Sequence, residues 1–213
     1  MLEHPKASET TKVKLTDDVT MGNQQENPST EELAWLAGII EGEGSISMNA
    51  RKKSWNGWNG IGVDVNITIA NTDSGIIYKS VGIFRKLGVE PKILEKDCNP
   101  IVGANGRTYH NPEKVIMYIS VGKFASAHSI LTAIIPFMAG QKLNRAKLMV
   151  EFIGRRMSKP KIRDYKGQSQ STYDQGDWAL VSKFYDETGA KLLPEVRVIL
   201  NDYTKGVSQE AVI

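Results

Sequence analysis

Two carboxylates, Glu41 and Glu43, lie two positions apart at the end of an apolar segment in this 213-residue chain. Ser29 and Glu32 are spaced as a capping box, so a helix is predicted over residues 29–43. The unpaired carbonyls and the negative dipole end of that helix favour a cation beside the two acids. Because hard metal ions prefer oxygen ligands, the pair could bind one. The alternative is a surface helix with two solvated acids.

Small residues recur on one face of the same predicted helix. Ala34, Gly38 and Gly42 follow one another at intervals of four residues, so they form a stripe along the helix. A stripe without bulky side chains lets another backbone approach closely. A second helix is therefore expected to pack against it.

The segments after this helix are predicted to form strands and further helices. Residues 45–51 alternate as in a strand, and after an Asn-Gly turn the apolar residues of 61–69 alternate with polar or small ones. This pattern predicts one face packed against helices and one polar face open to a partner. The tryptophans of the turn, Trp55 and Trp58, are expected to pack locally.

The remaining core elements follow the same logic. Apolar periodicity predicts a helix over 74–87, strands over 91–97 and 114–121, and helices over 123–138 and 141–156. The predicted fold class is α+β, with an α-β-β-α-β-β-α core. Residues 1–28 are polar and are expected to be a flexible tail. Residues 157–213 are expected to form a basic loop and accessory helices capped by Asp177 and opened by Pro194.

Composition excludes several classes of protein. Hydrophobic residues make up 40% of the chain and charged residues 24%, which is typical of a globular domain. The single cysteine, Cys98, cannot form an internal disulfide, and the histidines lack zinc spacing. Without an apolar run of membrane-spanning or signal-peptide length, no membrane partner is expected. The expected location is the cytoplasm or nucleoid, or the matrix of an organelle that encodes the gene, and not outside the cell.

Positive charge is concentrated late in the chain. Residues 142–166 contain nine Lys or Arg against two acids, whereas the net charge of the whole chain is +3. Such a cluster suits a polyanion such as DNA or RNA. The alternative is a solvated helix face that runs into a basic loop.

The segment Leu36-Ala37-Gly38-Ile39-Ile40-Glu41-Gly42-Glu43-Gly44 resembles the nine-residue signature of the LAGLIDADG homing endonucleases. The order of predicted elements over residues 29 to 156 is also similar to that family's order. Glu stands at 41 and 43 where Asp is commonest in the family. The resemblance implies a four-stranded antiparallel sheet that binds DNA, and, since the motif occurs once, a homodimer with a seam at Ala34, Ala37, Gly38 and Gly42.

The resemblance also implies roles for individual residues. Glu43, with the backbone of Gly42, matches the position that binds Mg²⁺ or another divalent ion such as Mn²⁺. Lys142 best matches the catalytic lysine, and Gln141 is the occupant if the alignment shifts by one residue. Asn71 matches the polar residue that positions water, although it could equally be a turn residue before the next helix.

DNA contact is expected from the polar strand faces, because a two-stranded ribbon fits the major groove. The candidates are Ser45, Ser47, Asn49, Arg51, Lys53, Asp64, Asn66, Thr68, Lys92 and Lys96. Arg155 and Arg156 are expected to hold flanking phosphates. The expected function is Mg²⁺-dependent cleavage of both strands of a long, roughly palindromic double-stranded DNA site, in the service of intron homing. The alternative is a non-cutting protein on the same scaffold, either a maturase that binds intron RNA or a DNA-binding regulator.

Overall fold

The computed structural model describes residues 26–55, 58–97, 115–160, 162–163, 169–170, 173–190, 194, 197–198 and 201. Its elements are α1 (Thr30–Gly42), β1 (Gly44–Trp55), β2 (Trp58–Asn71), α2 (Ser74–Lys86), β3 (Lys92–Asp97), β4 (Val115–Val121), α3 (Phe124–Ile134), η1 (Ile135–Phe137), α4 (Lys142–Ser158), β5 (Ile162–Arg163), β6 (Ser169–Gln170) and α5 (Gln175–Thr188). The predicted order α-β-β-α-β-β-α is confirmed. The predicted tail lies almost entirely outside the described residues.

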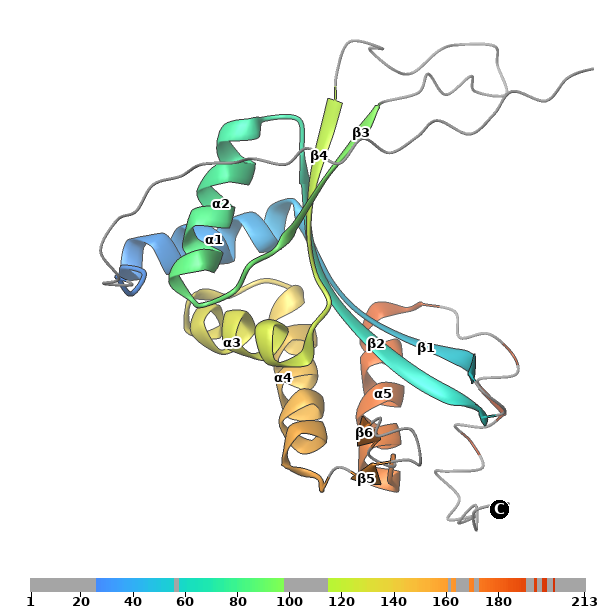
Figure 1. Cartoon of the computed structure of the whole chain (residues 1–213). Coiled ribbons are helices and arrows are strands. Elements are labelled where there is room, and N and C mark those ends of the chain that lie inside the picture. The colour runs from blue at the N-terminus through green and yellow to red at the C-terminus, as the bar shows by residue number, and fades with distance from the viewer. Residues whose placement is uncertain are drawn as a thin grey trace, which may run out of the picture.

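The first four strands form one antiparallel sheet in the order β1-β2-β4-β3. β1 and β2 pair along their whole length, from Gly44 opposite Ile69 to Trp55 opposite Trp58. β4 pairs with β2 only over Ile67–Asn71. The hairpin of β1 and β2 therefore continues beyond the four-stranded part as a two-stranded ribbon (Figure 1).

The helices cover one face of the sheet. α1 to α4 lie on the same side, and α5 lies beneath the outer part of the β1–β2 ribbon (Figure 1). The strand residues that face these helices are buried, as the alternation predicts. In β2 these are Ile61, Val63, Val65, Ile67 and Ile69. The opposite face keeps its polar side chains.

Local signals in the sequence account for most helix ends. Ser29 and Glu32 form the predicted capping box, since the Glu32 amide donates to Ser29 Oγ at 3.2 Å and the Ser29 amide donates to Glu32 Oε2 at 2.8 Å. α2 is followed by Gly88, whose φ of 74° is a conformation that favours glycine. The helix predicted over 123–138 is shorter, because Pro136 has no N–H to continue the α-helical bonds and η1 replaces the last turn.

α5 starts earlier than predicted. Its N-cap is Asp174, whose side chain accepts from the Asp177 amide at 2.9 Å. Asp177 is instead the third helical residue, and its Oδ2 accepts from the Asp174 amide at 3.1 Å. The helix predicted from Pro194 lies largely outside the described residues. Among the helices that the structure describes, none has the length and apolar character to cross a membrane.

Candidate nucleic-acid interface and active site

Glu43 lies at the junction between α1 and β1. It is the C-cap of α1, and its N–H donates to the Ile39 carbonyl at 2.8 Å. Both Glu43 and Gly42 are exposed. The described residues contain no group of three or more His, Cys, Asp and Glu that could hold a metal. Glu43 supplies a hard oxygen ligand of the kind that Mg²⁺ prefers, and among the described residues it is the exposed carboxylate at this junction.

Lys142 reaches the same helix end from the start of α4. Its Nζ donates to three carbonyls, those of Ile40 at 3.0 Å, Glu41 at 2.7 Å and Gly44 at 2.7 Å. These groups include orphan acceptors at the C-terminus of α1, where a cation also complements the helix dipole. The structure thus brings the two strongest catalytic candidates, Glu43 and Lys142, to one place.

Burial lowers the pKa of Lys142, and nearby Arg145 lowers it further, while the charges of Glu41 and Glu43 oppose the shift. The lysine therefore gives up its proton more readily than an exposed lysine does. Gln141, the alternative occupant, is the exposed N-cap of α4 and makes no capping bond with its side chain.

Glu41 does not accompany Glu43. Its Oε1 accepts from the Gly140 amide at 2.7 Å, and so it links the end of α1 to the turn before α4. A side chain at 140 would meet this carboxylate, since an added Cβ would lie 2.9 Å from Oε2. The predicted pair of metal-binding acids is therefore split: Glu41 holds the turn that carries Lys142, and Glu43 remains exposed.

Asn71 takes part in the turn before α2. Its Oδ1 accepts from the Asp73 amide at 2.8 Å, and Asp73 in turn caps α2 by accepting from the Gly75 amide. These contacts match the alternative interpretation of Asn71 as a turn residue.

The small-residue stripe of α1 lies at the surface. Ala34, Gly38 and Gly42 are exposed, and an added Cβ at Gly38 or Gly42 would meet no atom within 4 Å. Ala37 differs, because it is fully buried among the core residues of its own chain. The assignment of Ala37 to the seam is therefore corrected: its side chain has no surface to offer a partner.

The polar face of the sheet carries the predicted DNA-contacting residues side by side. Ser45 pairs with Thr68, Ser47 with Asn66 and Asn49 with Asp64. Lys92 and Lys96 are exposed on β3 at the other edge of the same face. Lys53 lies in β1 opposite Gly60, but its side chain is outside the described part, as are those of Trp55 and Trp58.

Two contacts order this face. Arg51 forms an ion pair with Asp64, from its Nε to Oδ2 at 2.5 Å. Ser120 of β4 donates from Oγ to Asn66 Oδ1 at 3.0 Å. Ser120 and its neighbour two positions away, Tyr118, complete the face but are absent from the sequence-based set. β4 pairs with β2 so that Ser120 lies opposite Thr68 of that set and Tyr118 lies opposite Ala70, two residues further along β2. Pairing with β2 was therefore the missing information.

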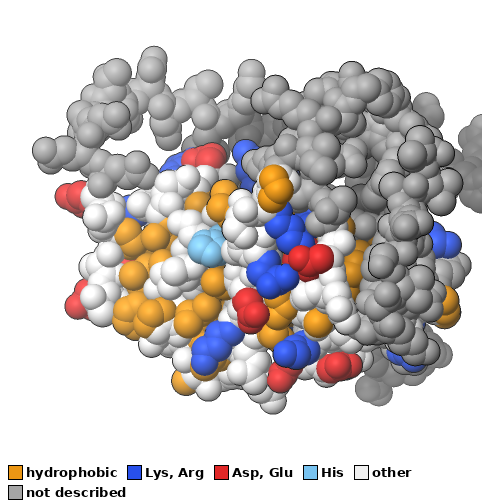
Figure 2. All heavy atoms as spheres, turned by 90° about the horizontal axis from the view of Figure 1, so that it is seen from below, with side chains coloured by type: hydrophobic (Ala, Val, Ile, Leu, Met, Phe, Trp, Pro, Cys, Tyr) orange, Lys and Arg blue, Asp and Glu red, His pale blue; other side chains and the backbone are white. Residues whose placement is uncertain are grey.

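The prediction that Arg156 binds phosphate is wrong. Arg156 is 7% exposed, and its Nη1 lies 3.2 Å from Oδ2 of the fully buried Asp177. Arg155 pairs with Asp174 at 3.1 Å and with Asp177 at 3.4 Å, so it is not a free phosphate ligand either. Lys159 also binds both acids. Much of the basic cluster thus joins α4 to α5, and Figure 2 shows acidic and basic side chains close together on this end of the molecule.

Comparison with solved structures identifies the fold. The group I intron-encoded homing endonuclease I-CeuI, complexed with DNA, superposes with a TM-score of 0.52 at 12% identity, over 81% of this chain and 76% of that one. The homing endonuclease I-CvuI, in complex with its target in the presence of Ca, gives 0.48 at 20% identity over 81% and 94% of the two chains. The homing endonuclease I-TnaI gives 0.46 at 11% identity over 84% and 99%.

Neither a protein-family model nor a curated protein matches the chain. The sequence motif and the superposition nevertheless point the same way. The motif Leu36–Gly44 forms the end of α1, and the strands that follow it build the antiparallel sheet. This chain has the fold of the LAGLIDADG homing endonucleases.

Proposed function

We propose that this protein is a homodimeric, divalent-metal-dependent endonuclease that cleaves both strands of a long, roughly palindromic DNA site. The observation that carries the proposal is the meeting of exposed Glu43 with Lys142 beside one edge of a polar sheet face. A scaffold for binding alone has no need of an acid and a partly buried lysine at one helix end. Intron homing is the role that fits such an activity.

Glu43 would hold Mg²⁺ or Mn²⁺ through its carboxylate, with the Gly42 backbone beside it. A divalent ion bound there supplies charge stabilisation and an activated water for hydrolysis of the phosphodiester. Lys142 is held by three carbonyls, so its ammonium is fixed without a side-chain partner and can stabilise charge that develops at the phosphate. Glu41 keeps the Lys142 turn in place through Gly140.

A second copy of the chain would complete the site. In the described part of the chain, Glu43 is the exposed acid at the end of α1, and the stripe of Ala34, Gly38 and Gly42 leaves room for the same helix of a partner. A twofold axis along this stripe would bring the two Glu43 carboxylates together. The cation would relieve the repulsion between the two carboxylates. The same twofold axis would present identical reading surfaces to the two halves of the DNA site, which is why a palindromic target is proposed.

The polar sheet face would lie in the major groove. Asn66 and Asn49 can read base edges, while Lys92 and Lys96 can contact phosphates. Arg51, although paired with Asp64, is 64% exposed in its side chain and sits on this face.

The test is a cleavage selection on a random duplex library, with Mg²⁺ compared with Ca²⁺. Wild type should yield cut ends from one long, twofold-related sequence in Mg²⁺, and Glu43→Gln should lower cleavage by about 10³-fold or more while leaving binding in place. Glu151→Gln, which removes an exposed acid of α4, is the matched control and should cleave as wild type does.

Two results would contradict the proposal. Equal cleavage by wild type and Glu43→Gln would remove Glu43 from the site. Specific binding without cut ends in any divalent ion would support the non-cutting alternatives, a DNA-binding regulator or, if RNA competes better than DNA, a maturase of intron RNA.

A further inference from the structure

The outer half of the β1–β2 ribbon lacks the support that its inner half has. β4 pairs with β2 at Ile67–Asn71 and with no residue of β2 before Ile67. From Asn66 to Trp58, β1 is the one strand that pairs with β2 in the described part of the chain. A two-stranded ribbon is only marginally stable by itself, and it twists more strongly than a larger sheet does. The direction of this outer ribbon must therefore be set by something other than the sheet.

Two tyrosine hydroxyls contact the outer ribbon from opposite edges. The Ala50 amide of β1 donates to the Tyr185 hydroxyl at 3.0 Å. The Val63 amide of β2 donates to the Tyr173 hydroxyl at 3.1 Å. Ala50 and Val63 are direct partners in the ladder, so the two hydroxyls bind one cross-strand pair through the N–H groups that point outward. We call Tyr173 and Tyr185 the tyrosine clamp.

Tyr173 is held rigidly. Its ring stacks on Trp178 with centroids 4.8 Å apart and on Phe152 at 6.4 Å, and the Arg156 guanidinium lies 3.8 Å from its centroid. Arg156 is itself fixed by the buried Asp177. Arg156, which is buried in this ion pair, thus orients the Tyr173 half of the clamp.

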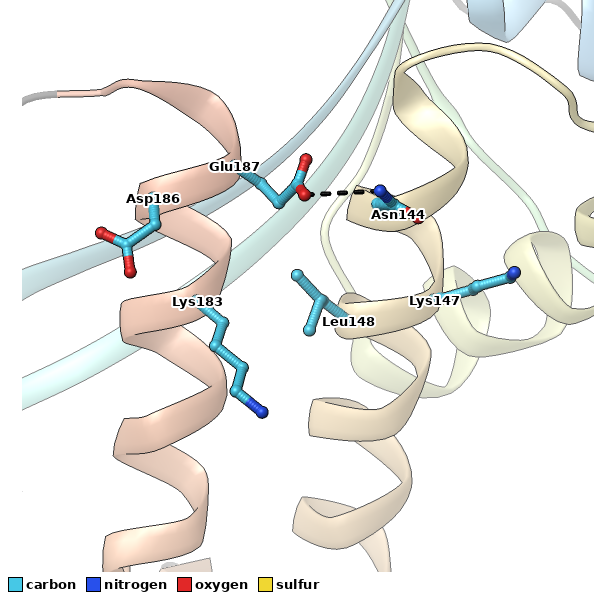
Figure 3. Close-up of a pocket in the computed structure, with 6 residues that line it drawn as sticks. All are labelled: Asn144, Lys147, Leu148, Lys183, Asp186 and Glu187. Atoms are coloured by element: carbon cyan, nitrogen blue, oxygen red, sulfur yellow. Dashed lines mark hydrogen bonds between the residues drawn. The ribbon is translucent and has the colours of Figure 1, made fainter.

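Tyr185 is held by the helix that carries it. α5 packs along α4, and the ion pairs of Asp174 and Asp177 fix its first turn. Its far end is joined to α4 where Asn144 Nδ2 donates to Glu187 Oε1 at 3.3 Å. Figure 3 shows this bond at one end of the open groove of about 620 Å³ that separates the two helices.

The clamp lies directly behind residues that face the predicted DNA. Asn49 and Arg51 flank Ala50 in β1, and Asp64 follows Val63 in β2, all with side chains on the polar face. Ala50 is seven residues from Glu43, a distance of about 23 Å along a strand. At 3.4 Å per base pair this is about seven base pairs from the acidic site.

We propose that Tyr173 and Tyr185 are positioning residues that set the angle of the outer ribbon and thereby fix specificity at the outer base pairs of the target. The proposal rests on the proposed DNA recognition, although not on cleavage. The inner base pairs, which face Ser45 and Thr68, depend on β4 instead, because Thr68 pairs with both Ser45 and Ser120.

The experiment uses the full chain with both tyrosines changed, Tyr173→Phe and Tyr185→Phe. Phenylalanine keeps the ring stacking and removes only the hydroxyl. Tyr78→Phe is the matched control, because Tyr78 is exposed on α2. Sites bound from a random duplex library are sequenced for each protein, and hydrogen exchange of the Ala50 and Val63 amides is measured without DNA.

In the double variant we expect exchange of the two amides to rise by about tenfold. Discrimination between bases should fall about fivefold at base pairs that lie about seven or more from the position of Glu43. Preferences at the inner base pairs should stay unchanged. Tyr78→Phe should match wild type in both measurements. Each single variant should show a smaller effect of the same kind, which keeps the test open if the double variant unfolds.

An unchanged specificity profile, or an equal loss at inner and outer positions, would overturn the proposal. Unchanged exchange at Ala50 and Val63 would overturn it as well. Because the readout is binding, absence of cleavage by wild type would count against the proposed endonuclease alone. Failure of wild type to select any duplex would overturn both.

Discussion

At the residue scale, the turn between α1 and β1 concentrates the chemistry. Within four residues the chain ends a helix, presents Glu43, and begins the first strand. Gly44 makes this possible, because an added Cβ would lie 2.7 Å from Ile40 Cα and 2.8 Å from the Ile40 carbonyl oxygen. The same residue supplies a carbonyl to Lys142. A glycine here thus serves packing and lysine placement together.

Gly44→Ala should therefore destabilise the protein by about 1–3 kcal/mol, since backbone atoms cannot move aside as a flexible side chain can. The rate of DNA cleavage should fall by more than the loss of folded protein accounts for, because a shift of Gly44 displaces the carbonyl that holds Lys142. Urea unfolding followed by circular dichroism measures the first effect. Gly82→Ala in α2, where an added Cβ meets no atom within 4 Å, is the control and should gain about 0.5–1 kcal/mol. Equal stability of the two variants would contradict this account.

The sequence predicted part of this site and missed part of it. Glu43 lies in the motif, and Lys142 lies near the start of the last core helix, where the resemblance implies a lysine. The structure brings these two residues together. Glu41 looks identical in sequence terms, being an acid at the same helix end. Its carboxylate nevertheless accepts a hydrogen bond from the Gly140 amide, 99 residues away in the chain. No local pattern reveals such a bond, because it depends on which turn packs against the helix.

At the element scale, the β strands were predictable and the α4–α5 pair was not. Alternation in β2 indicates its buried face because every second residue is apolar. Arg155 and Arg156 instead gave a misleading signal, since two adjacent arginines in a basic cluster are usually solvated. Their partners, Asp174 and Asp177, come later in the chain and form a capping box of their own. Burial of a charge is decided by such distant partners.

The Asp174 ion pairs predict how α5 responds to acid. Burial alone would raise the pKa of Asp174, but bonds from Lys159, the Asp177 amide and Arg155 outweigh it, so the pKa lies well below the ordinary value. A lowered folded-state pKa contributes stability that is present above the unfolded value of about 3.9 and is lost as pH falls toward the folded value. The partly exposed carboxylate is screened by solvent, so the contribution is modest.

Asp174→Asn should remove this contribution while keeping the cap, because asparagine is an equally good N-cap. The variant should be less stable than wild type at pH 7, and the difference should shrink as pH falls below about 4. Thermal unfolding of both proteins from pH 7 to pH 2.5 measures it. Asp186→Asn, at an exposed position near the other end of α5, should show no such convergence. A difference that stays constant with pH would contradict the assignment.

At the scale of the whole molecule, the described part of the chain has a filled core of its own, whereas the proposed site calls for a second copy of the chain. Its core is filled, with Leu36, Ala37 and Ile40 of α1 fully buried. The opposite face of α1 carries Ala34, Gly38 and Gly42 at the surface, and among the described residues no atom lies within 4 Å of a Cβ added at either glycine. Glu43 emerges at the end of this stripe. Symmetric pairing of two chains along this stripe would bring two copies of Glu43 together. It would also place one β1–β2 ribbon on each side of the pair.

Gly38→Leu separates folding of the chain from its pairing. In one chain the leucine side chain enters open space, so the free energy of unfolding should change little and leucine's helix propensity should even favour it. Between two α1 helices whose axes lie about 8 Å apart, two leucines would force the backbones away from each other. Sedimentation should therefore show wild type as a dimer and Gly38→Leu as a folded monomer that does not cleave DNA, because two copies of Glu43 no longer meet. Gly82→Leu, an equal change at another exposed helix position, should remain a dimer. If Gly38→Leu also stays a dimer, the partner binds elsewhere, and the acids of the site must be brought together by a different surface of the molecule.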